Sequence, residues 1–228
     1  MRGSKGITNN RRGSKGVDSP HRGSVAPSAL NVVPLIIYMS LVVLITFDKK
    51  PSKIAKRLRD YDVDFVEIDY EDLEQFLKTN RRQIKIFLIS GSKKRILRDG
   101  IYPSIDRILK MPIPIIGICY GFQYLAMRSG GVLEDGGETS MDNANMETVV
   151  DLGGEIVKMK IWVSHHDKVL KLPTKKVGAN AAIKAIWSID LMMDNMIYMA
   201  HTDKWIGYQF HPEFKKKSFD EFILPFVK

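Results

Sequence analysis

Between residues 40 and 129, the sequence alternates short apolar runs with segments that have the spacing of amphipathic helices. The apolar runs are rich in valine and isoleucine, as is typical of strands buried on both faces of a sheet. The predicted strands cover 40–47, 63–68, 84–90 and 113–118, and the predicted helices 51–61, 70–79, 101–111 and 122–129. Repeated strand–helix alternation implies a parallel sheet with helices on both sides. The sequence therefore predicts an α/β fold of three layers, with a mostly parallel central sheet.

The C-terminal half is richer in strands that are joined by short loops. Its predicted strands cover 155–164, 182–189, 196–202 and 206–210. We interpret residues 39–228 as one α/β domain with extra strands in its C-terminal half.

The first 38 residues have a different composition. An Arg-Gly-Ser motif recurs through 2–24, and 1–30 carry +5 of the formal net charge of +9. Such a segment has almost nothing to bury, so residues 1–38 are predicted to be a disordered basic extension. Met39 is a candidate native start, which would leave 1–38 outside the native protein. Because the charge excess is concentrated there, we do not expect the folded domain to bind nucleic acid, although an RNA-binding tail is an alternative.

The apolar run 31–47 is a candidate membrane span because a basic stretch precedes it. It is shorter than the ~20 apolar residues that a spanning helix needs, and Pro34 and Ser40 interrupt it. No membrane association is therefore expected. Cys119 is the only cysteine, which excludes an intrachain disulfide and a zinc site built from several cysteines. A reducing, cytoplasmic setting is the default expectation.

That cysteine lies in a pattern that favours a nucleophile. The predicted strand 113–118 runs into Gly117-Ile118-Cys119-Tyr120-Gly121, and a predicted helix follows at once. Glycines on both sides of Cys119 let the chain turn sharply and hold the thiol at the end of the strand. There the helix N-terminus favours the thiolate, and the backbone amide of Tyr120 points to where an oxyanion would develop. A buried structural cysteine is the alternative.

A second pattern near the C-terminus supplies a base for the thiol. The predicted strand 206–210 ends just before His211, and Pro212 prevents a helix there. Glu213 follows two residues after the imidazole and can fold back onto one ring nitrogen, which leaves the other for the thiol. The pattern predicts a Cys119-His211-Glu213 triad, although the His-Pro-Glu string alone is compatible with an ordinary surface turn.

These motifs carry a resemblance to a known family. Gly-Ile-Cys-Tyr-Gly-Phe-Gln, followed by Tyr-Gln-Phe-His-Pro-Glu, resembles the class I (triad) glutamine amidotransferases from about residue 41 to the end. The segment 162–173 is similar to the Ser-His-x-Asp stretch of the glutaminase domain of GMP synthetases. The resemblance implies the flavodoxin-like fold of that family.

The resemblance also implies roles for individual residues. Cys119 would attack the side-chain amide of glutamine, His211 would protonate the departing ammonia, and Glu213 would hold His211. Water would then hydrolyse the γ-glutamyl thioester. The oxyanion donors match the backbone amide of Tyr120 and the loop that contains Gly91. The positions that hold the amino-acid end of the substrate match Gln123, Ser164, His165, His166 and Asp167.

The same resemblance implies no metal and no organic cofactor for the reaction of this chain. The ammonia would pass to an ATP-pyrophosphatase synthetase that binds ATP and Mg²⁺ and converts XMP to GMP. In many members the two halves are fused, whereas this chain ends soon after Glu213. It therefore most resembles the separate glutaminase subunit of a two-chain GMP synthetase. The predicted partners are L-glutamine and that synthetase.

Departures from the family pattern leave alternatives open. Ser92 replaces a glycine of the oxyanion loop, the next position, Lys93, is not the usual proline, and His166 replaces a common glycine. The first loop after a strand, 47–53, lacks the usual Gly, Ser and Gln-rich composition. The alternatives are an impaired, amidotransferase-like regulatory or binding protein, a glutaminase for another acceptor of the anthranilate or aminodeoxychorismate type, and a stand-alone γ-glutamyl hydrolase.

Overall fold

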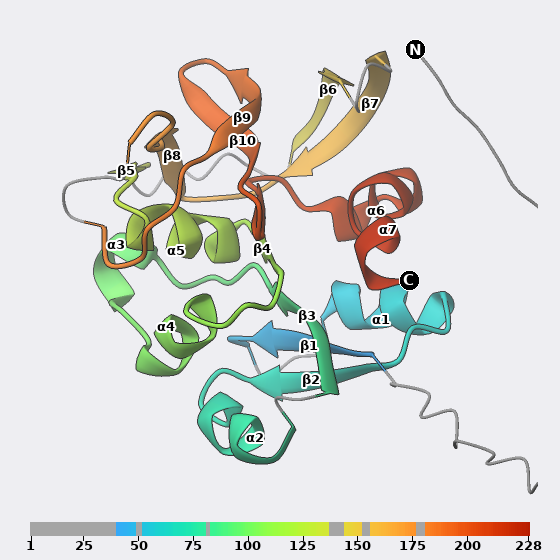
Figure 1. The fold of residues 1–228 in the computed structure, drawn as a ribbon. Helices are drawn as coiled ribbons and strands as arrows, with labels where there is room; N and C mark the ends of the chain where they lie inside the picture. The colour runs from blue at the N-terminus through green and yellow to red at the C-terminus, as the bar shows by residue number, and fades with distance from the viewer. Residues whose placement is uncertain (1–39, 49–51, 81–82, 137–143, 152–155, 177–180) are drawn as a thin grey trace, which may run out of the picture. The chain divides into compact units, whose positions relative to one another are not determined.

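The computed structural model describes 40–48, 52–80, 83–136, 144–151, 156–176 and 181–228, all within the unit Tyr38–Lys228 (Figure 1). The predicted basic extension, residues 1–38, lies outside the described residues and stays a prediction. Within the described ranges, no helix has both the length and the apolar character needed to cross a membrane.

The apolar runs form a central sheet of seven strands. Their order across the sheet is β2 (Phe65–Asp69), β1 (Leu41–Thr46), β3 (Ile84–Ile89), β4 (Ile115–Ile118), β11 (Trp205–Tyr208), β10 (Met196–His201) and β9 (Ser188–Met193). The first five strands are mutually parallel, and β10 and β9 are antiparallel to their neighbours. The prediction of a mostly parallel sheet with extra C-terminal strands is confirmed.

Helices cover both faces of the sheet, which gives the predicted three layers (Figure 1). One face packs Val42 and Leu44 of β1 against α1 (Lys53–Asp60), α6 (Lys216–Phe222) and α7 (Leu224–Val227). The other face packs Val43 and Ile45 against α2 (Leu73–Asn80), α3 (Ile96–Asp99), α4 (Pro103–Leu109) and α5 (Tyr120–Arg128). Burial on both faces explains why β1 is apolar at consecutive positions.

Two smaller pairs of strands complete the fold. β5 (Val132–Asp135) pairs antiparallel with β8 (Asp167–Lys171), and β6 (Ala144–Asp151) pairs antiparallel with β7 (Ile156–Val163). A short 3₁₀ helix, η2 (Pro212–Phe214), follows β11. Only β7 among these strands was predicted, from the run 155–164.

One predicted strand, 182–189, is mostly wrong. Strand β9 begins only at Ser188, and the preceding segment is irregular because its polar backbone groups bond elsewhere. The backbone amide of Ile183 donates to the carbonyl of Arg128 at 3.0 Å, and that of Trp187 donates to the carbonyl of Pro173 at 2.8 Å. The Trp187 indole, 2% exposed, also donates to Ser129 Oγ at 2.9 Å. The apolar residues of this segment therefore cover the end of α5 instead of joining a ladder.

Candidate active site

Cys119 lies at the sharp turn between β4 and α5. Its backbone has φ 51° and ψ −103°, a conformation that costs a non-glycine residue about 1–3 kcal/mol. The turn is fixed by the amide of Cys119, which donates to the carbonyl of Tyr208 at 2.6 Å. A Cβ on Gly117 would come within 2.6 Å of the Gly121 backbone, and one on Gly121 would overlap the carbonyl oxygen of Ile89. Both glycines are therefore required by the close approach of strand and helix.

His211 follows β11 and is held by the turn that comes after it. Its backbone amide donates to the carbonyl of Trp162 at 2.8 Å. Its Nδ1 lies 2.8 Å from Glu213 Oε1, and the two side chains are 12% and 7% exposed. Burial lowers the pKa of His211, but the Glu213 carboxylate and Cys119 outweigh that effect and raise it well above its ordinary value. The structure therefore stabilises the protonated form of this ring.

The thiol and the imidazole meet at one backbone carbonyl. The oxygen of Ser164 lies 3.4 Å from Cys119 Sγ and 3.1 Å from His211 Nε2. Gly91, which follows β3, packs against both side chains, since a Cβ there would lie 2.7 Å from His211 Cε1 and 3.5 Å from Cys119 Cβ. The structure therefore brings together residues from four separate segments that the sequence singled out.

Gln209 contacts the sulfur and was missed by the sequence analysis. It is fully buried, and its Nε2 donates weakly to Cys119 Sγ at 3.9 Å. The signal that could have found it is its place two residues before His211 in the Tyr-Gln-Phe-His-Pro-Glu motif.

A cavity of about 480 Å³ opens beside His211. It lies at the carboxyl ends of β1 and β3, the edge where parallel sheets bind ligands. Its lining comprises Thr46, Asp48, Ser52, Lys53, Ile54, Ser90, Gly91, Ser92, Lys93, Ser164, His211, Glu213 and Phe214. Part of the atypical first loop therefore forms a wall of the site.

Helix α1 holds the turn that carries Glu213. Arg57 Nε donates to the carbonyl of Glu213 at 3.2 Å, and Lys53 Nζ lies 3.4 Å from the centre of the Phe214 ring. The Phe214 ring also stacks on Trp162, with ring centroids 5.2 Å apart. The helix begins where Ser52 Oγ accepts from the amide of Ala55 at 3.0 Å, so the capping serine sets the position of these contacts.

The profile of the class I glutamine amidotransferase family matches residues 49–227. The chain belongs to this family. A curated relative, the glutamine-hydrolysing GMP synthase of Helicobacter pylori strain J99, is 34% identical over 166 residues, which cover 70% of this chain and 30% of the relative. The corresponding enzyme of Rhodopseudomonas palustris is 30% identical over 206 residues, which cover 83% of this chain and 35% of that enzyme. The chain thus spans about a third of the length of these relatives.

Solved structures show the same fold. A protein from Thermoplasma acidophilum, described as a candidate subunit of GMP synthase, superposes with a TM-score of 0.63 at 18% identity, covering 83% of this chain and 92% of that one. A glutamine amidotransferase from Thermotoga maritima superposes with a TM-score of 0.58 at 18% identity, covering 82% of each chain. The fold class and the resemblance drawn from the motifs are confirmed.

In this amidotransferase, the residues predicted to hold the substrate lie beside Cys119 along α5 and β8. Gln123, one turn after Cys119, donates from Nε2 to the carbonyl of Asp167 at 2.7 Å. Gln123 and Asp167 are 3% and 1% exposed, and Ser164 contacts the thiol as described. Ser164 lines the cavity beside His211, whereas Gln123 and Asp167 are bonded to each other and are not among the lining residues, so the role of these three residues in binding the substrate stays a prediction.

The two predicted histidines of the same stretch differ in their setting. His165 is 4% exposed, and its ring packs edge-on against Tyr198. Burial, with the charge of His211, lowers the pKa of His165 to about 4, so this ring is neutral near pH 7. His166 is half-buried, and its carbonyl closely approaches Gly136. Among the described residues, no three His, Cys, Asp or Glu side chains cluster as metal ligands would.

Proposed function

We propose that the chain hydrolyses L-glutamine through a cysteinyl thioester, with Cys119 as nucleophile, His211 as acid and base, and Glu213 as its partner. The observation that carries this proposal is the single carbonyl of Ser164 that contacts both Cys119 Sγ and His211 Nε2. Glu213 and Cys119 raise the pKa of His211, which supports its role as the acid because the imidazole keeps its proton.

In the first half-reaction, Sγ attacks the side-chain carbonyl carbon of glutamine and a C–S bond forms. The displaced electron pair becomes an oxyanion, which the backbone amides of Tyr120 and Gly91 would receive. Each such donor contributes ~3 kcal/mol to the stability of the transition state. The protonated His211 gives its proton to the amide nitrogen, the C–N bond breaks, and ammonia leaves.

In the second half-reaction, His211 removes a proton from water, which attacks the thioester carbon. The C–S bond breaks, glutamate leaves and the thiolate is restored. Each step uses groups of this chain, so the reaction as proposed needs neither a metal nor an organic cofactor here. A reducing, cytoplasmic setting, as predicted from the sequence, would keep the only cysteine available.

We further propose that the ammonia passes to a separate ATP-pyrophosphatase synthetase, which holds ATP and Mg²⁺ and aminates XMP to GMP. Both relatives named above are GMP synthases, and the Thermoplasma protein is described as a component of such an enzyme. The chain covers 92% of the length of that neighbour and about a third of the length of the GMP synthases.

A glutamine-directed chloroketone tests the glutaminase proposal. The wild-type protein is expected to gain one adduct, located on Cys119 by peptide mass spectrometry, and the Cys119→Ser variant none. Iodoacetamide, which requires only a reactive thiol, reports whether the sulfur is accessible. Alkylation by iodoacetamide without any chloroketone adduct, even with excess synthetase present, would support the regulatory alternative.

The acceptor is tested with a purified ATP-pyrophosphatase synthetase from the same source. Ammonium chloride should support GMP formation by that synthetase alone, whereas glutamine should support it only with the chain added. The Cys119→Ser variant should remove the glutamine-dependent rate and leave the ammonium-dependent rate unchanged. If the chain hydrolyses glutamine but no GMP forms from XMP, the result would favour another acceptor, of the anthranilate or aminodeoxychorismate type.

A further inference from the structure

Two carboxylates face each other across the β5–β8 pair. Asp135 and Asp167 are directly opposite in the register, and Asp167 is 1% exposed. Like charges at opposite positions of two strands repel, and a buried carboxylate needs a cation or hydrogen bonds to offset its desolvation. This arrangement therefore requires a cation from another segment.

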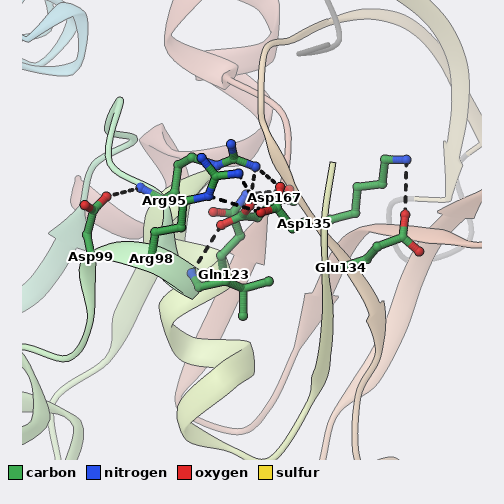
Figure 2. A network of polar contacts seen from close by, with 9 residues as sticks. Arg95, Arg98, Asp99, Gln123, Glu134, Asp135 and Asp167 are labelled. Atoms are coloured by element: carbon green, nitrogen blue, oxygen red, sulfur yellow. Dashed lines mark hydrogen bonds and ion pairs between the residues drawn. The ribbon is translucent and has the colours of Figure 1, made fainter. Parts of the chain in front are cut away.

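Arg95 supplies that cation (Figure 2). Its Nη2 is paired with Asp135 Oδ1 and lies 3.5 Å from Asp167 Oδ1. The Arg95 side chain is only 11% exposed, so the pair with Asp167 is shielded from water. Its position, in the loop between β3 and α3, is far from both strands in the sequence.

Asp167 also ties this loop to the candidate active site. Its Oδ2 accepts from the amide of Leu97 at 3.4 Å, and its carbonyl accepts from Gln123 at 2.7 Å. Arg95 and Leu97 thus fasten the end of the loop to β8, and β8 is fastened to the helix that begins at Cys119.

The other end of the same loop is Gly91, which packs against His211 and Cys119. Residues 92–94 form neither helix nor strand, and the amide of Lys94 donates to Ser92 Oγ at 3.0 Å. Gly91, Ser92 and Lys93 line the cavity beside His211. The position of the Gly91 amide therefore depends on how the far end of the loop is held.

We propose that Arg95 is a positioning residue for glutamine hydrolysis: by bridging Asp135 and Asp167, it holds the 91–95 loop so that the Gly91 amide faces the reacting carbonyl. The inference rests on the proposed function. Arg95 acts through the loop backbone and does not touch the substrate.

Arg98 provides a matched control. It donates to Asp135 Oδ2 from Nε at 3.2 Å and from Nη2 at 3.1 Å, but its side chain is 55% exposed. Arg98→Gln therefore removes one positive charge beside the same carboxylate without removing the bridge to Asp167. Any effect of charge alone should appear in both variants.

Steady-state glutamine hydrolysis, with the synthetase present if needed, is the first measurement. Arg95→Gln should lower kcat by at least about tenfold with KM changed less than about threefold, because an oxyanion donor acts in the transition state. Arg95→Lys should recover part of kcat, since the lysine ammonium keeps the positive charge but lacks the planar guanidinium that can bond two carboxylates at once. Arg98→Gln should leave both constants within about twofold of wild type. An unchanged kcat in Arg95→Gln, or a loss confined to KM, would overturn the inference.

Hydrogen exchange of the same proteins, read by mass spectrometry, tests whether Arg95 holds the loop, and this measurement does not depend on activity. The amides of Lys94 to Asp99 should exchange at least about fivefold faster in Arg95→Gln than in wild type or Arg98→Gln. Those of α1 should be unchanged, which verifies the fold. Equal exchange at 94–99 in all three proteins would refute the role of Arg95. An inactive, chloroketone-resistant wild type would instead refute the glutaminase proposal alone.

Discussion

Two buried histidines in the candidate site have opposite pKa shifts. Burial disfavours the cation in both rings, and at His165 it dominates, with the nearby charge of His211 lowering the pKa further. At His211 burial is outweighed by Glu213 and Cys119. The site therefore stabilises one imidazolium and not two, which supports the proposed role of His211 as acid and base.

The Glu213→Gln substitution should destabilise the protein in a pH-dependent way. A folded-state pKa that is raised above the unfolded value of ~6.5 gives stability that is fully present below that value and lost as pH rises through the folded pKa. Removing the carboxylate should therefore cost about 2 kcal/mol at pH 6 and clearly less at about pH 9. Urea denaturation at both pH values measures this difference.

The exposed Glu221 serves as the control for that experiment. Glu221→Gln changes the net charge equally but should alter the free energy of unfolding by under about 0.5 kcal/mol at either pH. An equal loss of stability at pH 6 and pH 9 in Glu213→Gln would mean that the carboxylate does not stabilise the imidazolium.

At the scale of elements, the start of helix α5 packs closely against the ends of strands β4 and β3. Gly121→Ala would place a Cβ against the carbonyl oxygen of Ile89, a backbone atom that cannot move away cheaply. We expect a loss of about 2 kcal/mol or more in unfolding free energy, together with at least about tenfold less chloroketone labelling, because the start of α5 must shift.

Gly100→Ala is the matched control for backbone strain. Gly100 has φ 87° and ψ −161°, with nothing within 4 Å of its ideal Cβ, so only the conformational cost of about 1–3 kcal/mol applies. Labelling of Cys119 should be unaffected. Equal labelling in Gly121→Ala and wild type would contradict a tight coupling between the junction and the thiol.

The elements that the sequence predicted are those whose burial is set by local pattern. The run 40–47 is apolar at consecutive positions because both faces of β1 are covered, and β1 spans Leu41–Thr46. Strand β5, by contrast, has mostly exposed side chains and forms only because β8 pairs with it. The segment 182–187 has the composition of a strand, but tertiary hydrogen bonds override that preference.

For the whole molecule, the candidate site also combines residues that local sequence patterns predict with contacts that only the fold creates. Cys119, His211 and Glu213 sit in short motifs whose glycine, proline and spacing have local causes, so the sequence could single them out. The bridge from Arg95 to Asp167 has no local signal, because it joins residues 72 positions apart through the pairing of β5 with β8. Non-local charge networks of this kind become visible only once the fold is known.

The removal of residues 1–38 tests where the domain begins. This segment holds +5 of the formal net charge of +9, and its first 30 residues hold little that could be buried, so a chain of residues 39–228 should keep its thermal midpoint within about 2 °C and its labelling at Cys119. A chain that starts at residue 48 is the control, because it lacks β1, which lies between β2 and β3 in the central sheet. That chain should not fold, since both neighbouring strands lose their partner and both cores lose buried residues. Failure of both truncated chains to fold, or a drop of more than about 5 °C for 39–228, would place part of the first 38 residues inside the folded domain.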